Sequence, residues 1–287
     1  MGKLGAVWAL HAVTGQFIWS FAVDGEVKSS PLVISLGREG IDGASRDEYV
    51  IVGSYDGFVY LIDVQTGRCL DTCQCGGAIF ASPVVTCDYG RSKGLCMATT
   101  SGEILRGLVK LADNKTHSPT IEILFRCSMH TPIFSTPLYC SMTDSVYCCG
   151  VDGSMHRLDS SGYEVWNKNE TVSSIFSSPA LCSDGIRSSF VVGAHDGIVR
   201  KVVCESGVIS WAENVSASIF GAPFCTLSSE VIVSTTAGKI VVLDDADGHI
   251  LAEIGLNAEI YSSVVVSGNI IFVGCRDDRI YCIKFTR

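Results

Sequence analysis

The sequence lacks long apolar runs, basic clusters and abundant proline. No apolar stretch in its 287 residues approaches the roughly 18 residues that a membrane-spanning helix requires. The formal net charge is −9 and the basic residues are not clustered. Nucleic acid and anionic membranes are therefore excluded as main partners, because a basic face binds both. The 7 prolines contrast with 29 glycines, which indicates many tight hairpin turns, and 47% hydrophobic residues are enough for a sizeable core.

Common signatures of catalysis and metal binding are also missing. The chain has no Gly-x-Ser-x-Gly elbow for a nucleophile, and Cys73-Gln-Cys75 has no second ligand pair at zinc-finger spacing. The six histidines are scattered: His195 precedes an Asp-Gly turn, and His130 and His156 have no counterpart at matched positions elsewhere. A structural role is favoured for each. We therefore predict no catalytic, cofactor-binding or metal-binding residues.

Fourteen cysteines do not indicate a disulfide framework in a chain of this length. Most lie in apolar, strand-like runs such as "LCMATT", "YCCGV" and "RIYCIKF". In such runs a free cysteine behaves as a small hydrophobic residue. We predict that most of the cysteines are buried and reduced, which implies a cytosolic or nuclear setting, and we expect a cytoplasmic protein.

One pentapeptide recurs six times. Its copies are VKSSP at 27–31, IFASP at 79–83, IFSTP at 133–137, IFSSP at 175–179, IFGAP at 219–223 and IYSSV at 260–264. Successive copies start 52, 54, 42, 44 and 41 residues apart. The two long intervals contain visible insertions at 35–47 and 111–119, so the repeating unit is a little over 40 residues.

The order of segments within each unit is constant. An apolar run follows the pentapeptide, and a two-residue turn such as Asp56-Gly57, Asp152-Gly153 or Asp196-Gly197 follows that run. Asp-Gly between β-rich runs is a strong hairpin signal, because a type I′ turn needs positive φ at both central residues. An alternating run, a second turn such as Thr66-Gly67 and a last run complete the unit. Three last runs carry tryptophan at matched positions, namely Trp19, Trp166 and Trp211.

Four short strands in each period of 40–50 residues, with no helical periodicity, predict an all-β fold: a β-propeller of four-stranded antiparallel blades. The pentapeptide marks the inner strand, where only small residues fit near the axis and where proline is tolerated at the first residue. The preceding Ile-Phe pair can pack between blades. The tryptophans are interpreted as blade-to-blade packing.

We expect a single domain over 1–287 with about six blades. An N-terminal half-blade at 5–23 precedes repeats that start near 27, 79, 133, 175, 219 and 260, and the last repeat ends after three strands. Two geometries are open. Either the ring closes with six blades, with residues 6–23 completing the blade that 260–275 begin, or the chain is a truncated arc of a larger propeller.

The unit "VGSYDGFVYLIDVQTGRCL" resembles the quinoprotein-type (PQQ-like) repeat. No Gly-His and Trp-Asp pair recurs, unlike in WD40 repeats. The stretches "CGGAIFASPVV" at 75–85 and "IFVGCRDDRIYCIKF" at 271–285 are similar to the C-terminal propeller of the adenylating acyl-activating enzymes, the β-alanine-activating or aminoadipate-semialdehyde-dehydrogenase-like family. The resemblance implies an adenylation domain and a phosphopantetheine carrier domain upstream. This sequence shows no phosphate loop with a lysine and no carrier-type serine motif.

Quinoproteins bind pyrroloquinoline quinone, often with calcium and a vicinal disulfide. Cys148-Cys149 is the one adjacent cysteine pair, but successive residues of a strand point to opposite faces, so packing is favoured. Calcium needs several converging oxygens, whereas Asp56, Asp152 and Asp196 are explained by their turns. We considered both cofactors, disfavour them, and predict none.

The expected function is a non-catalytic binding or scaffold module associated with an acyl-activating enzyme, with the adenylation and carrier domains absent from this chain. Its partner would be another protein or its own upstream adenylation and carrier domains, with no nucleic acid and no membrane. The alternatives are a quinone-dependent oxidoreductase and a secreted or periplasmic-type assembly scaffold.

Overall fold

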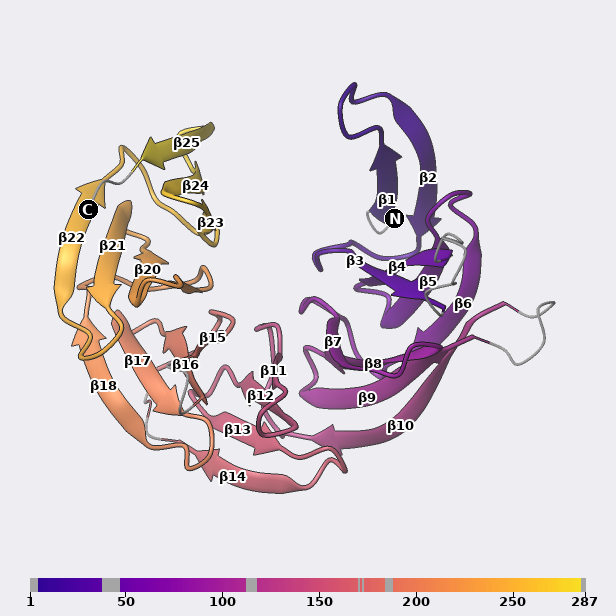
Figure 1. Ribbon diagram of the computed structural model, residues 1–287, viewed down its shortest axis with the longest axis horizontal. Helices are drawn as coiled ribbons and strands as arrows, with labels where there is room; N and C mark the ends of the chain where they lie inside the picture. The colour runs from indigo at the N-terminus through magenta and orange to yellow at the C-terminus, as the bar shows by residue number, and fades with distance from the viewer. Residues whose placement is uncertain are drawn as a thin grey trace. The chain divides into compact units, whose positions relative to one another are not determined.

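The computed structural model describes residues 5–37, 47–111, 118–169, 171, 173–183 and 188–284 (Figure 1). These residues hold 25 strands and no helix, so this part of the chain has no helix long and apolar enough to cross a membrane. Most of the insertions expected at 35–47 and 111–119 falls at 38–46 and 112–117, outside the described residues. By its contacts the chain divides into two compact units, Met1–Ser141 and Met142–Arg287.

Unit 1 contains the first eleven strands. They are β1 (Gly5–Leu10), β2 (Phe17–Val23), β3 (Leu32–Leu36), β4 (Asp47–Gly53), β5 (Phe58–Asp63), β6 (Cys69–Gln74), β7 (Val84–Asp88), β8 (Ser92–Ala98), β9 (Glu103–Lys110), β10 (Thr120–Ser128) and β11 (Leu138–Cys140).

Unit 2 contains the remaining strands. They are β12 (Ser145–Cys149), β13 (Met155–Leu158), β14 (Glu164–Lys168), β15 (Ala180–Ser183), β16 (Ser188–Gly193), β17 (Ile198–Val203), β18 (Ile209–Asn214), β19 (Phe224–Cys225), β20 (Glu230–Ser234), β21 (Lys239–Asp244), β22 (Ile250–Gly255), β23 (Val265–Ser267), β24 (Ile270–Cys275) and β25 (Arg279–Lys284).

The described strands form seven sheets in chain order. Five have four strands, ordered β3-β4-β5-β6, β10-β9-β8-β7, β11-β12-β13-β14, β15-β16-β17-β18 and β19-β20-β21-β22 (Figure 1). β1 pairs with β2 alone, and the last sheet is β23-β24-β25. Each of the first five pentapeptides precedes a four-stranded sheet and the sixth precedes the three-stranded one. The predicted all-β fold of four-stranded antiparallel blades is therefore confirmed.

The hydrophobic core of each unit lies between neighbouring sheets. In unit 1, Ile51 and Leu61 of one sheet pack with Leu95 and Leu105 of the next, and all four are fully buried. In unit 2, the sheets β15–β18 and β19–β22 are packed in the same way. Second strands are the most buried where sheets cover both faces: every residue of β12 and β16 is buried. In β24 of the last sheet only two of the six residues are buried.

The small residues of the pentapeptides tie neighbouring copies together by hydrogen bonds. At the fourth position, a backbone N–H of one copy donates to a hydroxyl of the next copy. The pairs are Ser30 with Ser82 (2.9 Å), Ser82 with Thr136 (3.1 Å) and Ala222 with Ser263 (2.9 Å). Small side chains were expected at these positions, but these hydrogen bonds to hydroxyl groups were not.

Each pentapeptide proline lies one residue before its strand rather than at the first paired residue, because it has no N–H to give to the ladder.

Tryptophan links the outer strand of one repeat to the next repeat. In three repeats the indole N–H donates to a carbonyl oxygen in the turn between the next third and fourth strands. The pairs are Trp19 with Val64 (2.8 Å), Trp166 with Cys204 (3.1 Å) and Trp211 with Asp245 (2.9 Å). The interpretation of the tryptophans as packing between blades is therefore confirmed.

The indole rings also explain the glycine of the second turn. Gly67, Gly207 and Gly248 have φ of +69°, +71° and +82°, a region that glycine adopts without strain. A Cβ added to Gly67 would lie 2.6 Å from the Trp19 ring, and one added to Gly248 would lie 2.5 Å from the Trp211 ring. The turn must therefore leave room for the tryptophan as well as adopt positive φ.

Candidate functional site

The three aspartates weighed as calcium ligands are used in their own hairpin turns. Each accepts a hydrogen bond from the backbone N–H two residues later, at 2.9–3.0 Å. Asp56 also accepts from the Tyr60 hydroxyl at 2.8 Å, and Asp196 pairs with the Arg200 guanidinium at 2.6 Å. Burial opposes the charge of Asp196, but the hydrogen bonds from Arg200 and from the backbone outweigh it and hold the pKa of Asp196 below its usual value.

The cysteines are less buried than the sequence predicts: seven of the fourteen are buried, five are half-buried, and Cys69 and Cys282 are exposed. Cys148 and Cys149 form no disulfide and are fully buried in β12. Cys182 and Cys225, inner-strand residues of neighbouring sheets with Cα atoms 5.7 Å apart, form a disulfide, which was not expected. Cys282 was expected to be buried but is exposed, because it lies on β25, the edge strand of the three-stranded sheet.

The histidines occupy different environments. His156 is buried and bonds Glu164 at 2.6 Å and Ser154 at 2.8 Å, so it is a satisfied structural residue as expected. His130 has a positive φ of 57° in a connection. The ring of His195 lies between two aromatic rings, and its Nε2 is buried without a hydrogen-bond partner.

One group in the described part of the chain has ligand atoms close enough to hold a metal ion. Asp244, Asp247 and His249 bring their atoms within 4.8 Å of one another in the β21–β22 turn. The turn itself explains these contacts, because Asp244 accepts from the Ala246 N–H at 2.7 Å and Asp247 accepts from His249 at 2.6 Å. The cluster is largely exposed, so turn formation accounts for it without an ion.

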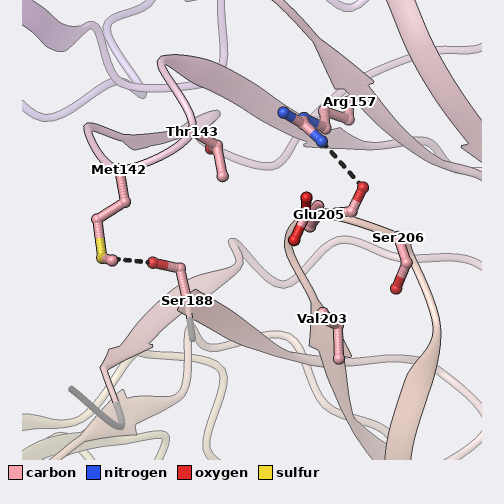
Figure 2. Close-up of a pocket in the computed structure, with 7 residues that line it drawn as sticks. All are labelled: Met142, Thr143, Arg157, Ser188, Val203, Glu205 and Ser206. Carbon is pink, nitrogen blue, oxygen red and sulfur yellow. Dashed lines mark hydrogen bonds between the residues drawn. The ribbon is translucent and has the colours of Figure 1, made fainter. Parts of the chain in front are cut away.

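A cavity of about 640 Å³ lies between two neighbouring sheets of unit 2. Its lining residues are Met142, Thr143, Arg157, Ser188, Val203, Glu205 and Ser206 (Figure 2).

The cavity has no nucleophile paired with a base among these residues. Arg157 donates to the backbone oxygen of Glu205 at 2.9 Å, and the Ser188 hydroxyl bonds the Met142 sulfur at 3.0 Å (Figure 2). The Thr143 hydroxyl is 2.9 Å from that of Tyr147. These polar groups hold the walls of the cavity together.

A second cavity of about 480 Å³ occupies the equivalent place one repeat later. Its Lys201 stands at the repeat position of Arg157 and bonds both the backbone and the carboxylate of Asp245, at 3.0 and 2.9 Å. Because the two cavities recur at matched positions, both are explained by the spacing of neighbouring blades.

One surface of unit 2 carries a line of rings with an arginine at its end, which we call the aromatic row. It consists of Phe176, His195, Phe220, Tyr261 and Arg276. Successive ring centroids are 4.9, 4.3 and 4.9 Å apart, and the Arg276 guanidinium lies 4.4 Å from the centre of the Tyr261 ring. All five side chains are partly exposed.

The pentapeptide explains how the aromatic row forms. Phe176, Phe220 and Tyr261 occupy its second position in three successive copies, and the isoleucines before them are fully buried. The buried isoleucine anchors each copy while the next side chain remains at the surface. The sequence signal was therefore visible, but the aromatic rings were assigned to packing between blades, and His195 and Arg276, which precede turns, were not connected to them.

Comparisons with known proteins agree with this architecture. The profile of the family described as "Beta-alanine-activating enzyme, beta-propeller" matches residues 3–285. The beta-alanine-activating enzyme of Drosophila melanogaster is 22% identical over 97% of this chain, and that of Danio rerio is 34% identical over 33% of it. The matched regions are 28% and 9% of those two proteins, so the chain spans well under a third of the curated relatives it matches.

Solved structures share the fold. BamB from Moraxella catarrhalis has a TM-score of 0.72 at 17% identity, with 98% of this chain and 80% of that one covered. Sqt1 of Saccharomyces cerevisiae has a TM-score of 0.76 at 15% identity, with 98% and 77% covered. At these identities the likeness concerns the fold alone. Since the family profile spans nearly the whole sequence, this chain belongs to the β-propeller family of the beta-alanine-activating enzymes.

Proposed function

We propose that this chain is a non-catalytic binding module of an acyl-activating enzyme, the class that adenylates a carboxylic acid and passes the acyl group to a carrier thiol. The aromatic row carries this proposal. It exposes rings from three successive repeats, whereas the turn aspartates and the cavity hydroxyls are engaged within the fold. The module would use the row to dock the remainder of the enzyme.

The chemistry of the aromatic row suits a protein partner. Aromatic residues and arginine are enriched at the centres of protein interfaces, where they supply rigid contact area. Tyr261 remains 37% exposed and Arg276 stacks on it, so both have surface to offer. The remainder of the enzyme is the occupant we favour, because most of the Drosophila relative lies outside the region that matches this chain. A tether within one polypeptide makes even a modest surface effective.

The test is a binding measurement between this chain and the rest of a beta-alanine-activating enzyme from the same species, produced separately. Binding is expected, and Phe220→Ala is expected to weaken it about tenfold or more, as for an interface hot spot. The matched control is Tyr163→Ala, since Tyr163 is 70% exposed in the same unit but lies outside the aromatic row. If the two variants bind equally well, the aromatic row is not part of the interface.

The non-catalytic part of the proposal has its own test. The chain alone should give no exchange of pyrophosphate into ATP with β-alanine or other carboxylic acids, whereas the whole enzyme should. Exchange by the isolated chain would contradict the proposal.

A cytoplasmic setting is proposed as well. Twelve of the fourteen cysteines are not in a disulfide, as expected where glutathione keeps thiols reduced. The Cys182–Cys225 pair should then be a dithiol in the cell. Titration of rapidly alkylated protein is expected to find all fourteen thiols reduced, and a stable disulfide in freshly lysed cells would point to an oxidising compartment.

A further inference from the structure

Two cysteines of neighbouring inner strands face each other in unit 2. Cys182 belongs to β15 and Cys225 to β19, and these two strands lie against each other. Their Cα atoms are 5.7 Å apart, which is within the most common range for a disulfide, and their sulfurs are bonded. The bond spans 43 residues and is the one disulfide among the cysteines that the structure describes.

The repeat explains why these two sheets can form the bond. Counted from the proline of the preceding pentapeptide, Cys182 is the third residue and Cys225 is the second. One repeat earlier, Cys140 is also a third residue, but Leu181 is the second residue of the repeat that follows it. Cys140 accordingly forms no disulfide. The sequence places cysteines at both positions of successive repeats only once, so the bond is specific to these two repeats.

The two cysteines differ in their access to solvent. Cys182 is only 2% exposed and belongs to the apolar core between the two sheets. Cys225 packs against the same core but is half-buried, and its sulfur lies 3.9 Å from the carbonyl oxygen of Ala180 in β15. A thiol reagent can therefore reach Cys225 first, and Cys182 can react only with a group that is already held beside the core.

We propose that Cys182 and Cys225 form a reversible cross-link, open as two thiols in a reducing cell and closed by exchange with glutathione disulfide when the thiol pool is oxidised. Cys225 reacts first. Its thiol loses a proton, its sulfur attacks one sulfur of glutathione disulfide, and the S–S bond breaks. The departing glutathione thiolate takes up a proton and leaves as the thiol.

The second step closes the cross-link. The Cys182 thiol loses its proton, its sulfur attacks the Cys225 sulfur of the mixed disulfide, and the second glutathione leaves as a thiolate that is then protonated. Two protein thiols are thereby oxidised, and one glutathione disulfide is reduced to two molecules of glutathione. Reduced glutathione drives the same steps in reverse, so the cross-link follows the redox state of the pool.

The cross-link lies close in the chain to the aromatic row. Phe176 and Phe220 belong to the pentapeptides that precede β15 and β19, and their rings are stacked with centroids 5.6 Å apart. In the same two pentapeptides, the buried Ser177 hydroxyl donates to the carbonyl oxygen of Gly221 at 3.0 Å. The disulfide adds a second fixed point to these two copies. The closed form should hold the two rings more firmly and lower the entropic cost of docking, a step that rests on the proposed function.

A metal site is the less favoured use of this pair. In the described part of the chain, the one group of three ligands close enough for a metal ion is the Asp244 cluster, which contains neither cysteine. Structural zinc is held by four ligands.

The first test maps the disulfides of the whole chain. The reduced chain is incubated in buffers of rising glutathione disulfide content, blocked with N-ethylmaleimide in denaturant and analysed as peptides without reductant. The peptide that joins Cys182 to Cys225 should appear as the buffer becomes oxidising and should be lost with dithiothreitol, while the similarly buried Cys140 stays unlinked. Absence of the joined peptide in every buffer, or a bond that dithiothreitol leaves intact, would overturn the proposal.

Single variants test the order of the two steps. Cys182→Ala should stop the reaction at the mixed disulfide, so that Cys225 keeps one glutathione. Cys225→Ala should leave Cys182 as an unmodified thiol, because the core shields it. Cys140→Ala is the matched control and should form the cross-link as the parent chain does, with circular dichroism verifying the fold of each variant. Equal attachment of glutathione in the first two variants would contradict the assigned order.

The closed form should also resist heat better than the open form. A disulfide that closes a loop of 43 residues should raise the midpoint of thermal unfolding by about 4 °C or more. The oxidised and reduced parent chains are compared, so the result does not depend on whether a variant folds. Equal midpoints would show that the bond does not constrain the two sheets and would overturn its role as a cross-link.

The last test concerns the aromatic row. After removal of glutathione, the oxidised chain should bind the separately produced remainder of the enzyme about threefold more tightly than the reduced chain. The Cys182→Ala variant should show no such difference. Equal binding by the oxidised and reduced parent chains would overturn the coupling to the row. Absence of binding by either form would contradict the proposed function and the coupling with it, whereas the cross-link itself is decided by the peptide map.

Discussion

The outer strands β18 and β6 stand at the same place in their repeats but meet the next repeat through different side chains. In β18, Trp211 donates its indole N–H to Asp245 and covers Gly248. In β6, the matched residue is Asp71, whose carboxylate accepts a hydrogen bond from the backbone N–H of Ile121 at 2.7 Å. Both side chains bridge to the neighbouring sheet, one with a large apolar surface and the other with a single charged acceptor.

The difference follows from what each side chain meets in the next repeat. The turn next to Trp211 contains Gly248, which leaves room for the ring. Asp71 instead meets the backbone of Ile121 in β10, and the sequence between β9 and β10 contains no glycine. A tryptophan needs a glycine turn to lie on, whereas a carboxylate needs one backbone N–H. Tryptophan in one repeat and glycine in the next therefore act as a pair.

Removing a tryptophan that links two repeats is expected to have the largest effect on stability. We call such a contact between the outer strand of one repeat and the next repeat a junction. Trp211→Ala should lower the free energy of unfolding by about 3–5 kcal/mol, because a ring that is only 8% exposed leaves a cavity. Urea unfolding measures the change. Trp8→Ala is the control, since Trp8 is 65% exposed, and it should cost much less. Similar losses for both variants would contradict the junction role.

The glycine half of the pair can be tested with two turns of equal geometry. Gly15 and Gly67 both have φ of +69°, but nothing lies within 4 Å of a Cβ added to Gly15, whereas the Trp19 ring would be 2.6 Å from one added to Gly67. Gly15→Ala should cost about 1 kcal/mol from backbone strain alone. Gly67→Ala should cost about 2–4 kcal/mol because overpacking is added to the strain. If the two variants have equal midpoints in thermal unfolding, the Trp19 ring moves aside without loss of stability, which would contradict this prediction.

The polar junction should be weaker than the tryptophan junctions. Asp71→Ala is expected to cost about 1–2 kcal/mol by removing the acceptor for the Ile121 N–H. Asp71→Asn keeps a carbonyl oxygen at the same place and should recover about half of the loss. Urea unfolding of the two variants provides the measurement. If alanine and asparagine cost the same, the hydrogen bond across the junction contributes nothing.

Asp196 forms its hydrogen bonds within its own hairpin, so its removal should have the smallest effect on stability. The folded-state pKa of Asp196 is lowered, so its contribution is present above the unfolded pKa of about 3.9 and is lost as the pH falls through the folded value. Asp196→Asn should cost no more than about 1 kcal/mol at pH 6, because the pair with Arg200 is partly open to solvent. Thermal unfolding from pH 6 to pH 3 should show the parent and the variant converging at the acidic end. If the difference in thermal stability between the parent chain and the variant widens toward pH 3, the prediction is wrong.

Particular elements show how much of the fold the sequence predicted. The order of strands followed from the Asp-Gly turns and the recurring pentapeptide, because turn conformation and strand alternation are local properties. The burial of Cys148 and Cys149 also followed from their apolar run. The exposure of Cys282 did not, because an apolar strand is buried only where another layer covers it. The pairing of residues 6–23 with 260–275 joins the two units and stays a prediction.

The candidate sites depended more strongly on the tertiary structure. The sequence identified each aromatic residue of the pentapeptide, but it could not show that Phe176, Phe220 and Tyr261 form one row with His195 and Arg276.

The sequence by itself thus determined the all-β repeat, the place of each hairpin and the family to which the chain belongs. These properties rest on short-range backbone preferences that every repeat restates. Only the tertiary structure decided which side chains of different repeats touch, such as the tryptophan on the next glycine and the backbone N–H on the hydroxyl of the next pentapeptide. Such contacts depend on the spacing between sheets and on the path of the connections, and no local pattern encodes either of these.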